Sequence, residues 1–191
     1  MGLSKQKLTS GFLSLFGNSD GISGLPDVHT KWTNAYHSYA MDAEDVSGDR
    51  VVTTNRTGFL SSLSLGSGNS IFQAALNFDR AFVAYWTGGI FAVGALIVVP
   101  PAGCPNVGGS GVWSSEITSV VTVVSAGVLA GLLVPVFSSI SDGDTARSKA
   151  RQMATAFHQA TISAVTVLIT GLDTTPGPTG PLPITNTCTI R

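Results

Sequence analysis

Residues 81–141 read AFVAYWTGGIFAVGALIVVPPAGCPNVGGSGVWSSEITSVVTVVSAGVLAGLLVPVFSSIS and contain a single charged side chain, that of Glu116. A segment this apolar must leave water, because burial of apolar surface is the dominant favourable term in folding and in association. Three destinations are open to it: the core of its own domain, a surface shared with other protein chains, or a lipid bilayer. The destination of this stretch therefore decides the class of function.

The composition of the whole chain points to a covered surface. The chain has 191 residues, which suits one domain, and only 11% of them are charged. Ordinary soluble domains carry roughly a quarter charged residues, so this chain is poorly suited to be a freely diffusing monomer. The net charge of -1 and the scattered Lys and Arg residues indicate neither a nucleic-acid-binding face nor an acidic tail. We expect partner proteins to cover much of the surface.

The spacing of apolar residues predicts a mainly α fold, with about five helices in a compact bundle. The third helix is capped by Asn69 or Ser70, breaks near Gly88, and carries Asp79 and Arg80 on its polar side. The fourth is apolar on nearly every side, which is typical of a helix buried all round. The predicted helices span residues 3–16, 26–45, 69–86, 114–139 and 145–170.

The chain divides into a body and a tail. Residues 1–172 are expected to form a single helical domain, with residues 3–16 as an N-terminal docking helix. Residues 173–191 are rich in proline and cannot form a regular helix, so we expect an extended C-terminal tail that lies along another surface. Residues 47–69 are polar and rich in Gly and Ser, which is typical of a loop.

The sequence contains none of the common motifs of enzymes and cofactor-binding sites. There is no hydrolase elbow, phosphate-binding loop or dinucleotide fingerprint, and we expect no enzyme activity, no cofactor, no metal site and no small-molecule substrate. Cys104 and Cys188 fit no metal pattern; a pair of intracellular thiols is the favoured interpretation, and a bond between them stays open. The histidines at 29, 37 and 158 are expected to be hydrogen-bonded or exposed and to bind no metal. The acidic cluster at 42–49 is expected to be a solvated helix end.

A basic cluster marks the start of the last predicted helix, where Arg147, Lys149 and Arg151 fall within two turns. Cations are mildly unfavourable at a helix N-terminus. Two interpretations are open: a solvated helix end, or a contact placed for an acidic partner.

A membrane hairpin is the alternative to a protein assembly. Residues 81–99 and 117–140 would form two spans joined by the Pro- and Gly-rich loop, because each lies in a long charge-free interval. The Gly127-Val-Leu-Ala-Gly131 segment matches a helix-packing motif of membrane proteins. The glycines of the first segment and Pro135 in the second count against it.

Four segments carry a resemblance. They are the opening MGLSKQKL, the W-x3-Y-x2-YA pattern at residues 32–40, FQAAL at residues 72–76, and Thr170-Gly171 before the proline-rich end. Together they resemble small virion proteins encoded in the tail or baseplate gene modules of contractile-tailed bacteriophages. The long Gly- and Val-rich middle is more apolar than this resemblance would lead one to expect. The resemblance implies a non-enzymatic part, present in many copies in a phage particle and packed against its neighbours.

The sequence thus leads to one hypothesis and one alternative. The hypothesis is a non-enzymatic virion structural protein, made in the host cytoplasm, that forms homo-oligomers and joins other virion proteins in a tail, baseplate or neck assembly through hydrophobic contacts. The alternative is a small two-span, holin-like protein of the inner membrane. The residues predicted to form the assembly interface are Phe12, Trp32, Tyr36, Phe82, Trp86, Val124, Leu129, Leu132, Arg147 and Arg151.

Overall fold

The computed structural model of this protein describes residues 2–17, 25–45, 50–64, 70–91, 113–139, 144–173 and 182–190. Within these ranges the fold is mainly α, as predicted, with an added antiparallel sheet. The helices are α1 (Lys5–Gly17), α2 (Leu25–Ala40), α3 (Arg56–Ser64), α4 (Ile71–Trp86), α5 (Val128–Ser139) and α6 (Ala146–Ala164). The strands are β1 (Val51–Thr53), β2 (Ile90–Phe91), β3 (Trp113–Val124), β4 (Val165–Asp173) and β5 (Leu182–Thr189).

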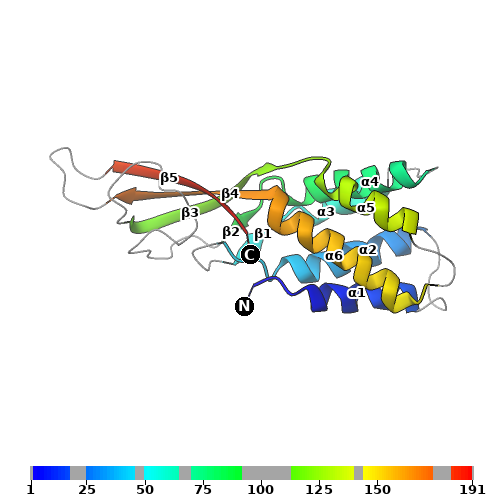
Figure 1. The fold of residues 1–191 in the computed structure, drawn as a ribbon. Coiled ribbons are helices and arrows are strands. Elements are labelled where there is room, and N and C mark those ends of the chain that lie inside the picture. Colours follow the sequence, from blue (N-terminus) through cyan, green and yellow to red (C-terminus); the bar gives the residue numbers. More distant parts are fainter. Residues whose placement is uncertain are drawn as a thin grey trace.

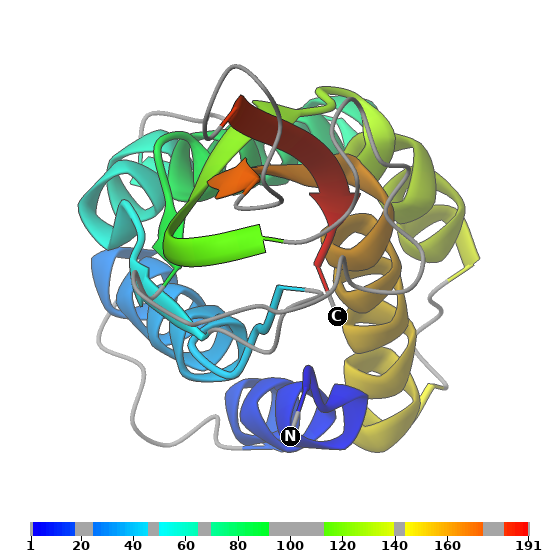
Figure 2. The same ribbon diagram turned by 90° about the vertical axis from the view of Figure 1, so that its left-hand side faces the viewer.

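The helices and the sheet occupy opposite ends of the molecule (Figure 1). Strands β3, β4 and β5 project from the helical body, and their far ends extend beyond the helices (Figure 1). Seen from the sheet end, the helices surround the base of the strands (Figure 2). The protein therefore presents two kinds of surface, the flanks of a helical body and a projecting sheet.

The sheet has the order β1-β2-β3-β4-β5, and each neighbouring pair is antiparallel. In its centre Val121 of β3 lies opposite Val167 of β4. Along β4, Val165, Val167 and Ile169 are fully buried, while the residues between them are partly exposed. This alternation is what a strand with one covered face requires.

Two of the predicted helices differ markedly from the structure: one starts later than predicted, and the other ends earlier. The helix predicted at 114–139 is wrong in its first half, which forms β3; only α5 is helical. The helix predicted at 145–170 ends at Ala164 and continues as β4. Seven of the eight residues in ITSVVTVV at 117–124 are β-branched, a side-chain type that favours strands. A buried strand and a buried helix are both apolar on every side, so the apolar pattern alone did not separate them.

Other boundaries agree more closely with the sequence. Ser70 caps α4 as expected, because its hydroxyl accepts a hydrogen bond from the backbone N–H of Gln73. Helix α4 ends at Trp86, close to Gly88, whose φ of 73° suits glycine. The polar segment predicted as a loop contains a helix that the sequence analysis missed, α3. The predicted docking helix is α1, and it packs on the body against α2 and α6.

Gly11 allows α1 to approach α2 closely. A β-carbon added at Gly11 would lie 3.2 Å from the Cβ of Ala35. This distance is tighter than ordinary van der Waals contact, so a larger side chain would push the two helices apart.

The described part of the C-terminal tail, residues 182–190, is extended, as expected, and its strand belongs to the sheet of its own chain. Strand β5 pairs with β4 from Thr166 opposite Thr189 to Asp173 opposite Leu182. Strand β4 itself runs across the predicted boundary between residues 172 and 173.

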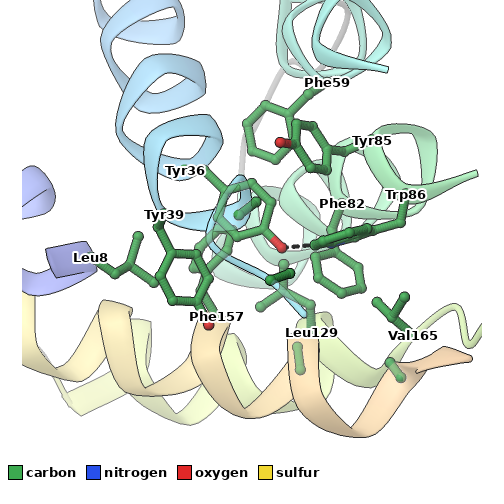
Figure 3. Packing of buried hydrophobic residues seen from close by; sticks show 14 of the residues in the cluster. Leu8, Tyr36, Tyr39, Phe59, Phe82, Tyr85, Trp86, Leu129, Phe157 and Val165 are labelled. Atoms are coloured by element: carbon green, nitrogen blue, oxygen red, sulfur yellow. Dashed lines mark hydrogen bonds between the residues drawn. The ribbon is translucent and has the colours of Figure 1, made fainter. Parts of the chain in front are cut away.

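An aromatic core fills the helical body where α2, α4 and α6 meet (Figure 3). The ring of Tyr36 lies at its centre, with ring centroids 5.1 Å from Tyr85 and 5.3 Å from Phe157. The hydroxyl of Tyr36 accepts a hydrogen bond from the indole N–H of Trp86 at 2.7 Å and lies 2.8 Å from the hydroxyl of Thr161. The buried hydroxyl of Tyr36 and the indole N–H of Trp86 are thus hydrogen-bonded inside the core, as a stable interior requires.

Candidate functional site

The structure separates the ten predicted interface residues into two groups. The first group is fully or almost fully buried within the chain itself, and a side chain in that position cannot also contact another subunit. These are core residues, which corrects their assignment to an assembly interface. They are Phe12, Trp32, Tyr36, Phe82, Trp86 and Leu129.

The structure brings the aromatic members of this group together. The ring centroids of Phe12 and Trp32 are 4.5 Å apart, and those of Tyr36 and Phe82 are 6.2 Å apart. Trp86 reaches the same cluster through its hydrogen bond to Tyr36. The sequence identified residues that pack with one another, but their contacts are made inside the chain.

The second group keeps part of its surface in water. Val124 lies at the end of β3 and is half-buried, as is Leu132 on α5. Arg147 and Arg151 are exposed on α6. The structure brings Leu132 and Arg151 to one place, a groove between α5 and α6.

The groove has a volume of about 350 Å³ and an apolar floor. Leu132 and Val136, one helical turn apart, form its wall on α5. The α6 wall consists of Arg151, Gln152, Thr155, Ala156 and Gln159. We call this feature the α5/α6 groove. Four of its residues, Val136, Gln152, Thr155 and Gln159, were not singled out from the sequence, because only the pairing of α5 with α6 places them together.

Helix α6 forms its wall because it has two different faces. Its core face is made of small and apolar residues, among them Ala150, Met153 and Phe157, which are buried. Arg147, Arg151 and Thr155 follow one another at intervals of four residues and so share one edge of the helix. Arg147 therefore extends the cationic edge that Arg151 begins at the groove.

Arg147 and Arg151 form no ion pair within the described part of the chain. Ion pairs in the described residues join Lys7 to Asp42, Lys31 to Asp27, and Arg50 to Glu44, and none of these includes Arg147 or Arg151. Neither α5 nor α6 contains an acidic residue. The positive end of the α6 dipole adds to the cationic character of the edge.

Asp79 fixes the α5 wall of the groove, and the sequence analysis placed it wrongly on the polar side of α4. Its side chain is buried, with 4% of the residue exposed. Its carboxylate accepts hydrogen bonds from the backbone N–H groups of Gly127, Leu129 and Ala130, at 2.8, 3.1 and 3.2 Å. A carboxylate at a helix N-terminus satisfies otherwise unpaired donors and faces the positive end of the dipole. The sequence contains a clue: Asp79 lies on the same stripe of α4 as Ala75, Phe82 and Trp86.

Two tyrosine–histidine pairs connect the helices of the body. Nδ1 of His37 lies 2.8 Å from the hydroxyl of Tyr85, and Nδ1 of His158 lies 2.7 Å from that of Tyr39. Burial lowers the pKa of both histidines, with smaller contributions from the Arg56 charge at His37 and the Lys5 charge at His158. Burial raises the pKa of both tyrosines. Each phenol is therefore hydrogen-bonded to a neutral imidazole, which is a structural arrangement.

The histidines and carboxylates do not gather into a metal site within the part of the chain that the structure describes. His29 lies near Ser64, with 3.5 Å between Nδ1 and the hydroxyl oxygen. In the acidic segment, Asp42 pairs with Lys7 and Glu44 with Arg50, whereas Asp49 lies outside the described residues.

The segments of the membrane alternative have other structures. The second predicted span is divided between β3 and α5, and the residues of the first span beyond 91 lie outside the described ranges. Gly127 precedes α5 with a φ of 85°, and a side chain at Gly131 would meet open space, so this glycine pair packs against no helix among the residues that the structure describes. Among the described residues, no helix combines the length and the apolar character needed to cross a membrane.

Cys188 is disulfide-bonded, in contrast to the expected pair of thiols. It lies on β5 and is almost fully buried. The other cysteine of the sequence, Cys104, lies outside the described residues.

Comparison with known proteins adds no further constraint: no family model, curated protein or solved structure matches this chain. The resemblance to phage tail-module proteins thus depends on the sequence segments given above. The structure places residues 32–40 in α2 and residues 72–76 in α4, both of which contribute to the aromatic core.

Proposed function

We propose that this protein is a non-enzymatic structural component of a tailed-bacteriophage particle, present in many copies in the tail, baseplate or neck. It is made in the host cytoplasm and is held in the particle by hydrophobic contacts with other copies and other virion proteins. The observation that carries the proposal is the α5/α6 groove, an apolar depression edged by cations that have no ion-pair partner among the described residues.

A groove of this kind is suited to protein contact. Interfaces between proteins have apolar centres surrounded by polar and charged rims, and arginine is enriched in them. Leu132 and Val136 supply the apolar centre, while Arg151 and the two glutamines supply the rim. With so few charged residues in the chain, such a surface is more stable covered than in water.

The exposed apolar residues elsewhere support the same proposal. Ile71 and Phe72, adjacent at the start of α4, are 45% and 61% exposed. Val52 on β1 and Val123 on β3 are more than half exposed. The projecting sheet extends this surface away from the helical body (Figure 1). Several separate contact surfaces are what a subunit with more than one neighbour requires.

The proposal is tested by quantitative mass spectrometry of purified phage particles and by incorporation of variants. We expect several copies of the protein in each particle. Leu132→Arg places a charge in the groove and should prevent incorporation while the purified variant keeps its thermal unfolding midpoint. Ser138→Arg, an exposed position of α5 that does not line the groove, is the matched control and should be incorporated normally. Absence of the protein from particles would contradict the proposal.

A further inference from the structure

We propose that the α5/α6 groove binds an acidic amphipathic helix from a different protein chain. This inference rests on the proposed function, because it names the partner of the same site. It follows from the shape of the groove, from the charge at its edge, and from the acidic residues of this chain's own helices.

The shape of the groove fits a helix. Leu132 and Val136 are one turn apart on α5, and Gln152, Ala156 and Gln159 extend over two turns of α6. Two turns correspond to about 10 Å of helix length. Amphipathic helices bind grooves of this kind through apolar side chains spaced three, four and seven residues apart. The volume of about 350 Å³ accommodates a few such side chains.

The charge at the edge selects an acidic partner. Arg147 and Arg151 are exposed, lie one turn apart, and make no ion pair within the described chain. A complementary helix carries two carboxylates one turn apart, beside its apolar stripe, so that each faces one arginine. Gln159 offers an amide group to the same ligand backbone or side chains, whereas the amide of Gln152 is already hydrogen-bonded to Ser139 and Ser148.

The described helices of this chain do not provide such a partner. They contain two acidic residues, Asp27 on α2 and Asp79 on α4. Asp27 forms an ion pair with Lys31 at 2.7 Å, and Asp79 is buried beneath α5. A second copy therefore has no described helix that presents unpaired carboxylates beside an apolar stripe. The complementary helix belongs to another protein.

The inference is tested with designed peptides and the full chain. The probe is a fluorescein-labelled helical peptide of about 18 residues, with leucines along one stripe and two glutamates one turn apart beside it. Two otherwise identical peptides carry glutamine or lysine in place of the glutamates. Fluorescence anisotropy should show the tightest binding for the glutamate peptide, with about fivefold weaker binding for the glutamine peptide and a further loss for the lysine peptide. Added salt should reduce these differences.

Charge reversal then assigns the selectivity to the groove. Arg147→Glu with Arg151→Glu should invert the order, so that the lysine peptide binds best. Arg80→Glu makes the same change at an exposed position of α4 outside the groove and should leave the order unchanged. Leu132→Arg should abolish binding of all three peptides. Thermal unfolding of each variant shows that its fold is retained.

Several results would overturn the inference. They are absence of binding, equal binding of the three peptides, or an effect of Arg80→Glu as large as that of the double reversal. A dimer in sedimentation experiments that Leu132→Arg dissociates would identify a second copy as the occupant instead. Binding to phosphatidylglycerol vesicles that the double reversal removes would identify a lipid surface. Presence in particles without peptide selectivity would leave the proposed function standing and reject only the acidic partner.

Discussion

Replacement of Asp79 by alanine should destabilise the protein far more than the same replacement at a solvent-exposed helix position, where the sequence had placed Asp79. Asp79 connects α4 to the start of α5 through three hydrogen bonds to backbone N–H groups. Alanine retains the helix propensity of α4 but removes every acceptor. The effect therefore reports the loss of the connection and not a weaker α4.

The expected magnitude follows from the surroundings of the three donors. Leu129 and Ala130 are buried, so their N–H groups would lose their partner away from water, at about 1 to 2 kcal/mol each. Gly127 is exposed, and its N–H can bind water instead. Loss of the favourable charge at the helix N-terminus adds about 1 kcal/mol. We expect Asp79→Ala to lower the free energy of unfolding by about 3 to 5 kcal/mol, or about 6 to 20 °C in Tm.

Urea unfolding followed by circular dichroism measures this change. Asp79→Asn keeps one oxygen that can accept from the buried N–H groups, and it should cost about half as much. Asp42→Ala is the control, since it removes an exposed carboxylate that pairs with Lys7, and exposed pairs contribute at most about 1 kcal/mol. If Asp79→Ala cost no more than Asp42→Ala, the buried carboxylate would not hold α5 in place and our account of the groove wall would be wrong.

Three further predictions concern other parts of the molecule. Gly131→Ala should raise the free energy of unfolding by about 0.5 to 1 kcal/mol, because the position is helical and open, whereas Gly127→Ala should lower it by about 1 kcal/mol, because its φ is positive; urea unfolding compares the two. Since burial lowers the pKa of His37 and His158 from 6.5, their contribution to stability is complete above that pH and is lost as the pH falls through the lower folded-state pKa; urea midpoints should decrease as the pH is lowered below 6.5, and His158→Gln should reduce this decrease. Thiol titration of the unfolded, unreduced chain should detect no free thiol, and dithiothreitol should lower Tm; a reactive thiol would contradict the bond at Cys188.

The helices with a regular apolar stripe could be predicted from the sequence. Helices α1 and α4 lie where the spacing placed them, and α2 starts where it was predicted but ends at Ala40, before the predicted residue 45. The cap at Ser70 and the break near Gly88 follow from local backbone chemistry. These features depend on residues within a few positions of one another, which a sequence displays directly.

The contacts of the candidate site were harder to predict from the sequence. Aromatic residues such as Trp86 were correctly identified as residues that pack, but their burial inside one chain depends on helices far apart in sequence. Leu132 and Arg151 were named without their shared groove, because α5 and α6 meet only in three dimensions. Asp79 was misplaced because a carboxylate on an apolar stripe is stable only when another segment supplies its donors.

Three properties of this protein could be inferred from its amino-acid sequence: it is mainly helical, its middle third must leave water, and it is poor in charged residues. The tertiary structure alone decided which part of that apolar middle is strand and which is helix. Residues 117–124 are stable as a strand because β4, more than 40 positions away, supplies their hydrogen-bond partners, as when Val121 lies opposite Val167. A strand needs such a distant partner, whereas a helix forms its backbone hydrogen bonds locally.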